Sequence, residues 1–173
     1  MDLHHVRCTP VFPRVCQAAA ASICSIALSG AAFADCTKVK TRGSLADKIE
    51  IIFKNDTQTD IGLQITKSDT NDLSGASEKV VQSKIVAAET KADYSGNLGD
   101  NAKKTFEIRY GRDLNSFTIE NEKASKSGTN AKSTYSGAGM PRDSSSRDIS
   151  CDASFKANSN RWSVKLTVST PTQ

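Results

Sequence analysis

The sequence predicts an all-β domain, a small antiparallel β-sandwich of about seven or eight short strands, closed by one disulfide. Three observations predict it: short runs in which apolar and polar residues alternate, turn signals at regular spacing between these runs, and two cysteines at opposite ends of the domain. The clearest runs are Ile149 to Phe155 and Trp162 to Val168, which flank an Asn- and Ser-containing turn at 157–160. They predict a β-hairpin with Cys151 on its apolar face.

The first 34 residues are expected to be a signal peptide rather than part of the domain. Arg7 and Arg14 form a basic start, residues 18–28 form a short Ala-rich apolar run, and small residues surround Ala34. This order is typical of a secretory signal, and the apolar run is too short to cross a membrane. We therefore expect cleavage near Ala34 and export of a single domain, 35–173, to the periplasm or the extracellular space.

Cleavage at this point changes the chemistry of the chain. It removes both histidines and three of the five cysteines, and it lowers the formal net charge from +4 to +3. Cys36 and Cys151 remain, and in an oxidising compartment two cysteines usually pair. Closing so long a loop is worth roughly 4–5 kcal/mol in chain entropy. The small net charge does not indicate nucleic acid as a partner.

The chain up to residue 92 predicts further strands. Residues 48–54 and 61–66 alternate around a polar turn at 55–60, and this pattern predicts a second antiparallel hairpin. The segment 78–92 fits either a helical stripe or two short strands. We favour strands because no capping box precedes it.

Two more strands, 105–111 and 116–120, complete the pattern. We expect the large apolar residues that alternate toward one side of all these strands to form the core. They are Ile49, Ile51, Phe53, Ile61, Leu63, Ile65, Phe106, Ile108, Tyr110, Phe117, Ile119, Phe155, Trp162, Val164 and Leu166.

The segment 121–147 differs from the rest of the domain. It is rich in Ser, Gly, Lys, Thr and Asn, and Tyr135 and Met140 are its large apolar residues. Long unpatterned loops in compact domains are usually functional or disordered, and a short strand near Tyr135 would divide this one. We therefore expect a long flexible loop that contacts a ligand through Tyr135, Met140 and Arg142.

Several catalytic mechanisms do not fit the exported part of the chain. Without histidine, a Ser-His-Asp triad, a Cys-His pair and His-based zinc sites are excluded. Paired carboxylates remain, and Glu50, Glu107 and Glu120 are the candidates for a glycoside hydrolase. Each is expected on the outer side of a strand, where a glutamate is usually solvated. We assign no catalytic residue, cofactor or metal.

Two loop features give only weak indications of a site. Asp69, Asn71 and Asp72, or Asp56 and Asp60, carry oxygens suited to calcium, but the spacing does not match an EF-hand and such residues usually bond their own backbone. Asn55 begins a glycosylation sequon, which matters only in a eukaryotic host.

These observations predict a secreted or periplasmic, non-catalytic binding module whose partner is a protein or a glycan. One alternative is a membrane- or lipid-binding β-sandwich protein. The size and the early strand pattern resemble those of small membrane-binding β-sandwich proteins such as the aegerolysins, a resemblance of fold without a shared motif. A second alternative is a carboxylate-dependent glycoside hydrolase.

Overall fold

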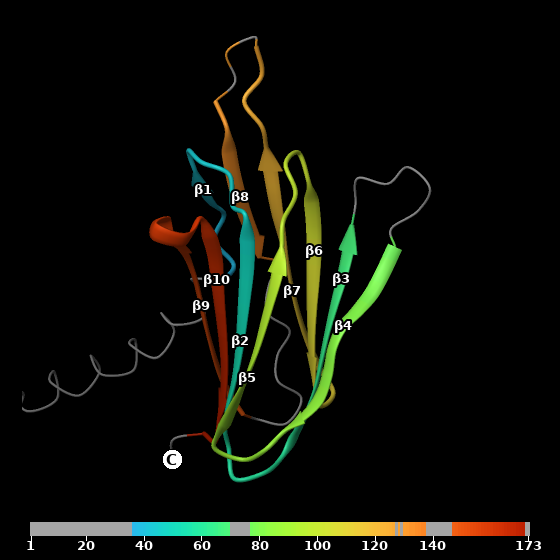
Figure 1. Ribbon diagram of the computed structural model, residues 1–173. Helices are drawn as coiled ribbons and strands as arrows, with labels where there is room; N and C mark the ends of the chain where they lie inside the picture. Colours follow the sequence, from blue (N-terminus) through green and yellow to red (C-terminus); the bar gives the residue numbers. More distant parts are fainter. Residues whose placement is uncertain (1–35, 70–76, 127, 129, 138–146, 172–173) are drawn as a thin grey trace, which may run out of the picture. The chain divides into compact units, whose positions relative to one another are not determined.

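Two β-sheets packed face to face make up the domain, as the computed structural model shows (Figure 1). The structure describes residues 36–69, 77–126, 128, 130–137 and 147–171, which all belong to one compact unit, Ala31–Gln173. The strands are β1 (Lys40–Arg42), β2 (Lys48–Asp56), β3 (Ile61–Asp69), β4 (Ser77–Val86), β5 (Thr90–Asn97), β6 (Lys103–Tyr110), β7 (Asp113–Glu122), β8 (Lys132–Gly137), β9 (Asp148–Lys156) and β10 (Arg161–Ser169).

The larger sheet has six strands in the order β1-β8-β7-β6-β3-β4, and the smaller has four in the order β5-β2-β10-β9. All neighbours are antiparallel except β2 and β10, which run parallel through the middle of the smaller sheet. The all-β sandwich is thus confirmed, with ten strands among the described residues rather than seven or eight. The segment 78–92 forms strand as expected, contributing most of β4 and the start of β5.

The C-terminal hairpin is confirmed. Strands β9 and β10 pair antiparallel, with Cys151 opposite Leu166 and Phe155 opposite Trp162. A 3₁₀ turn at Ala157–Ser159 connects them, and Asn160 closes it in the left-handed conformation at φ 42°. Asparagine adopts this conformation more readily than most residues.

The expected hairpin of 48–54 with 61–66 is wrong, because β2 and β3 lie in different sheets. Their connection is a corner between the sheets, built around Asn55, which is fully buried. Its Nδ2 donates to the carbonyl oxygens of Thr59, Val86 and Ala87, and its Oδ1 accepts from Thr57. The side-chain nitrogen that would carry a glycan is therefore occupied inside the folded domain.

The core lies between the sheets and contains the apolar residues expected there; Phe155 alone among them is only partly buried, packed against the rest. Aromatic rings run through it in contact: Phe106 with Phe117, Phe117 with Tyr135, and Tyr135 with Trp162, at centroid separations of 5.3, 5.5 and 5.7 Å. Trp162 also donates its Nε1–H to Ser133 Oγ at 2.9 Å. A buried indole N–H usually needs such a partner.

The disulfide between Cys36 and Cys151 is confirmed, with Cα atoms 5.5 Å apart. Cys36 lies just before β1, which pairs with β8 in the larger sheet. Cys151 lies on β9 in the smaller sheet. A Cβ atom on Gly137 would collide with the carbonyl oxygen of Cys36, so glycine permits this close approach. The disulfide therefore links the two sheets, and it is consistent with an oxidising location.

Candidate functional site

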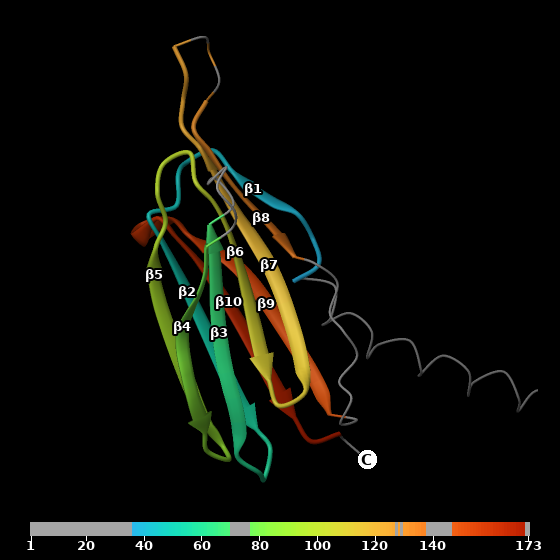
Figure 2. The same cartoon turned by 90° about the vertical axis from the view of Figure 1, so that its right-hand side faces the viewer.

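The segment 121–147 is partly built into the sandwich. Its first two residues end β7, and β8 crosses its middle, where a short strand was expected. Asn121 is buried, exchanging hydrogen bonds with the backbone of Ala46. The described residues of the connection between β7 and β8 on either side of its tip, 123–126 and 130–131, extend beyond the ends of the sheets (Figures 1 and 2).

Tyr135, expected to contact a ligand, is a core residue, and that prediction is wrong. Its side chain is 1% exposed, and its hydroxyl donates to the carbonyl oxygen of Cys36 at 2.9 Å. It alternates with outward Thr134 and Ser136 on β8, so its ring points between the sheets. Met140 and Arg142, the other predicted contacts, lie outside the described residues.

The three candidate carboxylates of a hydrolase do not all lie in one sheet. Glu50 is on β2 in the smaller sheet, where it pairs with Arg161 at 3.4 Å and accepts from Ser163 Oγ at 3.2 Å. Glu107 and Glu120 are on β6 and β7 in the larger sheet, and Glu120 pairs with Lys103. The structure therefore separates Glu50 from the other two.

The loop residues whose oxygens would suit calcium are engaged with protein groups where the structure describes them. Asp69 pairs with Lys104 at 3.1 Å and with Lys67 at 3.4 Å. Burial alone would raise the pKa of Asp69, but hydrogen bonds and charge from the two lysines outweigh it and hold that pKa below its ordinary value. Asp56 pairs with Lys54, and Asp60 accepts from the amide of Ala88.

Asn71 and Asp72 lie outside the described residues. Among the residues that are described, no three His, Cys, Asp or Glu side chains gather as a metal site. Tyr94 is half-buried on β5 and packs against Phe106. Burial raises the pKa of Tyr94 above its ordinary value. The positive charge of Lys67 opposes this rise, and the negative charge of Asp69 adds to it.

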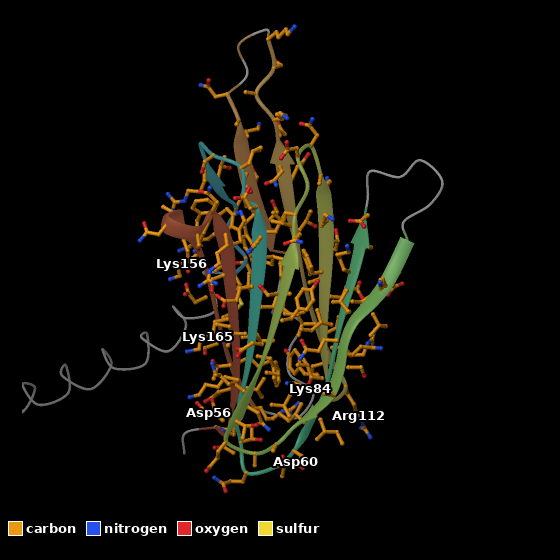
Figure 3. All side chains as sticks on the ribbon, viewed as in Figure 1. Asp56, Asp60, Lys84, Arg112, Lys156 and Lys165 are labelled. Carbon is orange, nitrogen blue, oxygen red and sulfur yellow. A yellow bond between two sulfur atoms is a disulfide. The ribbon has the colours of Figure 1, made fainter. Side chains whose placement is uncertain are left out.

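A groove on the outer side of the larger sheet offers a different surface for binding. It has a volume of about 400 Å³ and is lined by Gly62, Leu63, Gln64, Ser83, Lys84, Ile85, Arg109 and Gly111. We call it the β3–β4–β6 groove, after the strands that carry most of these residues. Lys84 is labelled in Figure 3 on the β4 side of the domain, away from Lys156 and Lys165 on the side of β9 and β10.

The groove lies where two glycines stand side by side: Gly62 on β3, and Gly111 just after β6, whose N–H donates to the carbonyl oxygen of Gly62 at 3.0 Å. Gly62 stands opposite Ile85 of β4, and Gln64 stands between Ser83 of β4 and Arg109 of β6. Directly opposed residues in antiparallel strands point to the same side. A Cβ atom at Gly62 would meet nothing within 4 Å. The missing side chain therefore leaves a hollow between Ile85 and Arg109.

The groove combines an exposed aliphatic side chain with one cation on its outer face. Ile85 is 72% exposed, and it stands opposite Gly62. Lys84 and Arg109 are exposed, and neither pairs with a carboxylate in the part of the chain that the structure describes. The lining contains no acidic residue. Lys84 stands opposite buried Leu63, so its side chain leaves β4 on the other face. Ile85 and Arg109 are therefore the apolar and the charged side chain that share the outer face of the groove.

Sequence reasoning missed this groove, although two weak signals were present. Ile85 and Val86 are adjacent on one strand, so one of them must face outward, and burial of Val86 leaves Ile85 in solvent. Gly62 occupies an outward position between Ile61 and Leu63. Neither signal locates a groove without knowing that β3 lies between β4 and β6.

Comparison with family models and with curated proteins finds no match to this chain. Within the described residues, no helix is long and apolar enough to cross a membrane.

Proposed function

We propose that this protein is an exported, non-catalytic binding module that holds a protein partner in the β3–β4–β6 groove. The observation that carries the proposal is Ile85, a 72% exposed aliphatic side chain beside the open space at Gly62, with Arg109 on the same outer face and no acidic residue in the lining. Contact of an exposed apolar side chain with water is unfavourable, so a partner that covers the side chain gains binding free energy.

The character of the exposed apolar surface favours a protein over a glycan. The large hydrophobic side chains exposed among the described residues are Val39, Val80 and Ile85, all aliphatic, and two of them lie on β4. Apolar and arginine side chains are typical of the centre of protein interfaces. Sugar recognition would instead favour an exposed aromatic ring.

The proposal of export rests on the signal-like N-terminus together with the disulfide. Cys36 and Cys151 are buried and cross-linked, and such bonds persist in oxidising compartments. Mass spectrometry of native protein tests this part. An amino terminus near Asp35 and the absence of free thiols are expected, and an intact Met1 terminus would contradict export.

Site-directed photo-crosslinking tests the interface. A benzophenone amino acid would replace Ile85 in the groove, Lys126 in the β7–β8 connection, or Lys156 on β9, all of which are exposed. With extracytoplasmic extract of the native source, we expect a discrete adduct from position 85 and none from position 156. Equal adducts from 85 and 156, or none from any position, would contradict a partner in the groove. An adduct from position 126 alone would move the interface to that connection.

A membrane surface is the competing proposal, because cations beside an exposed aliphatic side chain also suit anionic head groups. Sedimentation with phosphatidylglycerol-containing liposomes separates the two proposals. Binding to liposomes that is lost when Lys84 and Arg109 are reversed in charge would favour the membrane.

A further inference from the structure

We propose that the outer face of the smaller sheet binds an anionic polysaccharide along three cations that stand side by side, Lys48, Arg161 and Lys156. We call these three residues the basic row. They belong to β2, β10 and β9, which are neighbours in the smaller sheet, whereas the β3–β4–β6 groove lies on the outer side of the larger sheet. The basic row is therefore a second binding surface, independent of the proposed function.

Strand pairing places the three cations of the basic row next to one another. Arg161 stands opposite Lys48 of β2 on one side and opposite Lys156 of β9 on the other, and Figure 3 labels Lys156. Neighbouring strands lie about 4.8 Å apart, so the row spans roughly 10 Å of backbone. The residues that adjoin the three cations in the chain and pack in or against the core are Ile49, Trp162 and Phe155. Because side chains alternate along a strand, all three cations leave the sheet on its outer face.

The positive charge of the basic row is only partly neutralised within the domain. Glu50, the next outward residue of β2, pairs with Arg161 at 3.4 Å. Lys48 and Lys156 are exposed, and neither pairs with a carboxylate among the residues that the structure describes. Like charges directly opposed in a sheet repel each other. A bound anion would relieve this repulsion, so the row favours an anionic ligand.

A second set of neighbouring cations on the same face is neutralised, unlike the basic row. Lys54 of β2 stands opposite Lys91 of β5, again on the outer face. Each has an aspartate of its own, because Lys54 pairs with Asp56 and Lys91 pairs with Asp93. The positive charge of this face is therefore concentrated at the end that carries the basic row.

The surroundings of the basic row favour a polysaccharide over a protein or a membrane. Asn97 stands opposite Lys48, and Ser95 and Ser154 lie one outward position further along β5 and β9, where their polar groups can bond to sugar hydroxyls. Protein interfaces and membrane anchors generally use exposed apolar side chains. The exposed large hydrophobic residues of the described chain all lie outside the smaller sheet and are Val39, Val80 and Ile85.

The charge of the ligand replaces the aromatic ring on which an uncharged sugar usually stacks. Lysine and arginine form charge-assisted hydrogen bonds with carboxylate and sulfate oxygens, which are stronger than bonds between neutral groups. A sugar chain that carries such groups at intervals can contact Lys48 and Lys156 together. The ligand class is therefore a polysaccharide with carboxylate or sulfate groups.

Amide NMR titration with oligosaccharides tests the inference on the oxidised protein. The probes are heparin oligosaccharides, which carry sulfates and carboxylates, polygalacturonate oligosaccharides, which carry carboxylates alone, and uncharged dextran oligosaccharides. We expect at least one acidic probe to shift the amides of Lys48, Lys156 and Arg161 while that of Ile85 stays unmoved, and dextran to shift none. Binding should weaken as salt rises toward about 0.5 M, where exposed charges are screened.

Paired charge-removal variants supply the control, because both lower the net charge by two on the same face. The variant K48Q/K156Q should weaken binding of the acidic probe by about tenfold. The variant K54Q/K91Q should bind within about twofold of wild type, because Lys54 lies six residues along β2 from Lys48, about 20 Å away and beyond the Debye length of about 10 Å at 0.1 M salt. Unchanged thermal unfolding of both variants would show that the domain still folds.

Several results would overturn the inference. These are no shift with either acidic probe, equal shifts with dextran, or equal loss of binding in the two variants. Polyglutamate that binds the basic row as tightly as the acidic oligosaccharides would indicate an acidic protein segment instead. Phosphatidylglycerol liposomes that bind through Lys48 and Lys156, when the oligosaccharides do not, would indicate a membrane surface instead.

Failure of this inference and failure of the proposed function are distinguishable. A polysaccharide on the basic row gives no discrete protein adduct from position 156, so the crosslinking test of the groove is unaffected. A discrete adduct from position 85 without oligosaccharide binding would leave the groove as the binding surface and overturn the basic row. Oligosaccharide binding without an adduct from position 85 would support the basic row and contradict the partner in the groove.

Discussion

Removing the disulfide should destabilise the domain substantially, because Cys36 and Cys151 are 115 residues apart. For a loop of this length, chain entropy in the unfolded state gives about 5 kcal/mol at 25 °C. For a domain of this size, such a loss would lower the melting temperature by roughly 15 °C. The perturbation is the double substitution C36A/C151A, which leaves the backbone carbonyl of Cys36 available to Tyr135.

Urea denaturation of wild type and of C36A/C151A, followed by Trp162 fluorescence, measures the difference. The variant should have a lower midpoint and a steeper slope with denaturant, because the unlinked chain exposes more surface on unfolding. Wild type reduced with dithiothreitol should match the variant. A loss below about 1 kcal/mol, with an unchanged slope, would refute the argument that the cross-link acts by restricting the unfolded chain.

Three further substitutions test two buried polar contacts and one ion pair at the surface. Asn55→Asp replaces an amide that donates to three carbonyl oxygens and should cost about 3 kcal/mol or more in urea denaturation, whereas Asp56→Asn beside it should stay within about 0.5 kcal/mol. Trp162→Phe leaves Ser133 Oγ buried without its donor, which by itself costs about 1–3 kcal/mol, and the smaller ring should add to this loss of stability. Adding Ser133→Ala should recover part of the loss. No recovery would show that the hydrogen bond contributes little to stability. Asp69→Asn should cost under about 1 kcal/mol at pH 7. The pKa of Asp69 is lowered in the folded state, so Asp69 stabilises the fold at pH values above its ordinary pKa of 3.8, and this stabilisation is lost as the pH falls through the folded pKa. If the stability difference between Asp69→Asn and wild type persisted unchanged at pH 2, the ion pairs of Asp69 would not be its cause.

Much of the fold was predictable because alternation is a local property of a strand. In β10, Trp162, Val164, Leu166 and Val168 must share one face whatever lies beside them, and all four are buried. The disulfide was predictable for an equally simple reason. Once the first 34 residues are set aside, Cys36 has Cys151 as its one possible partner.

The choice of partner strands was not predictable, because it depends on contacts between distant segments. The pattern of β2 and β3 fits a hairpin, but β2 instead pairs parallel with β10 and antiparallel with β5. The polar residues of the expected turn therefore became a buried corner around Asn55. Local alternation determines which face a residue takes, and only the assembled sheets determine what covers that face.

The candidate site shows the same division. The sequence by itself determined a sandwich domain with one cross-link and with no histidine in residues 35–173, because composition and alternation are read residue by residue. Only the tertiary structure decided that Tyr135 lies in the core and that Gly62, Ile85 and Arg109 meet on one outer face. Those three residues come from three strands, and the hollow between them exists only when β3 is placed between β4 and β6.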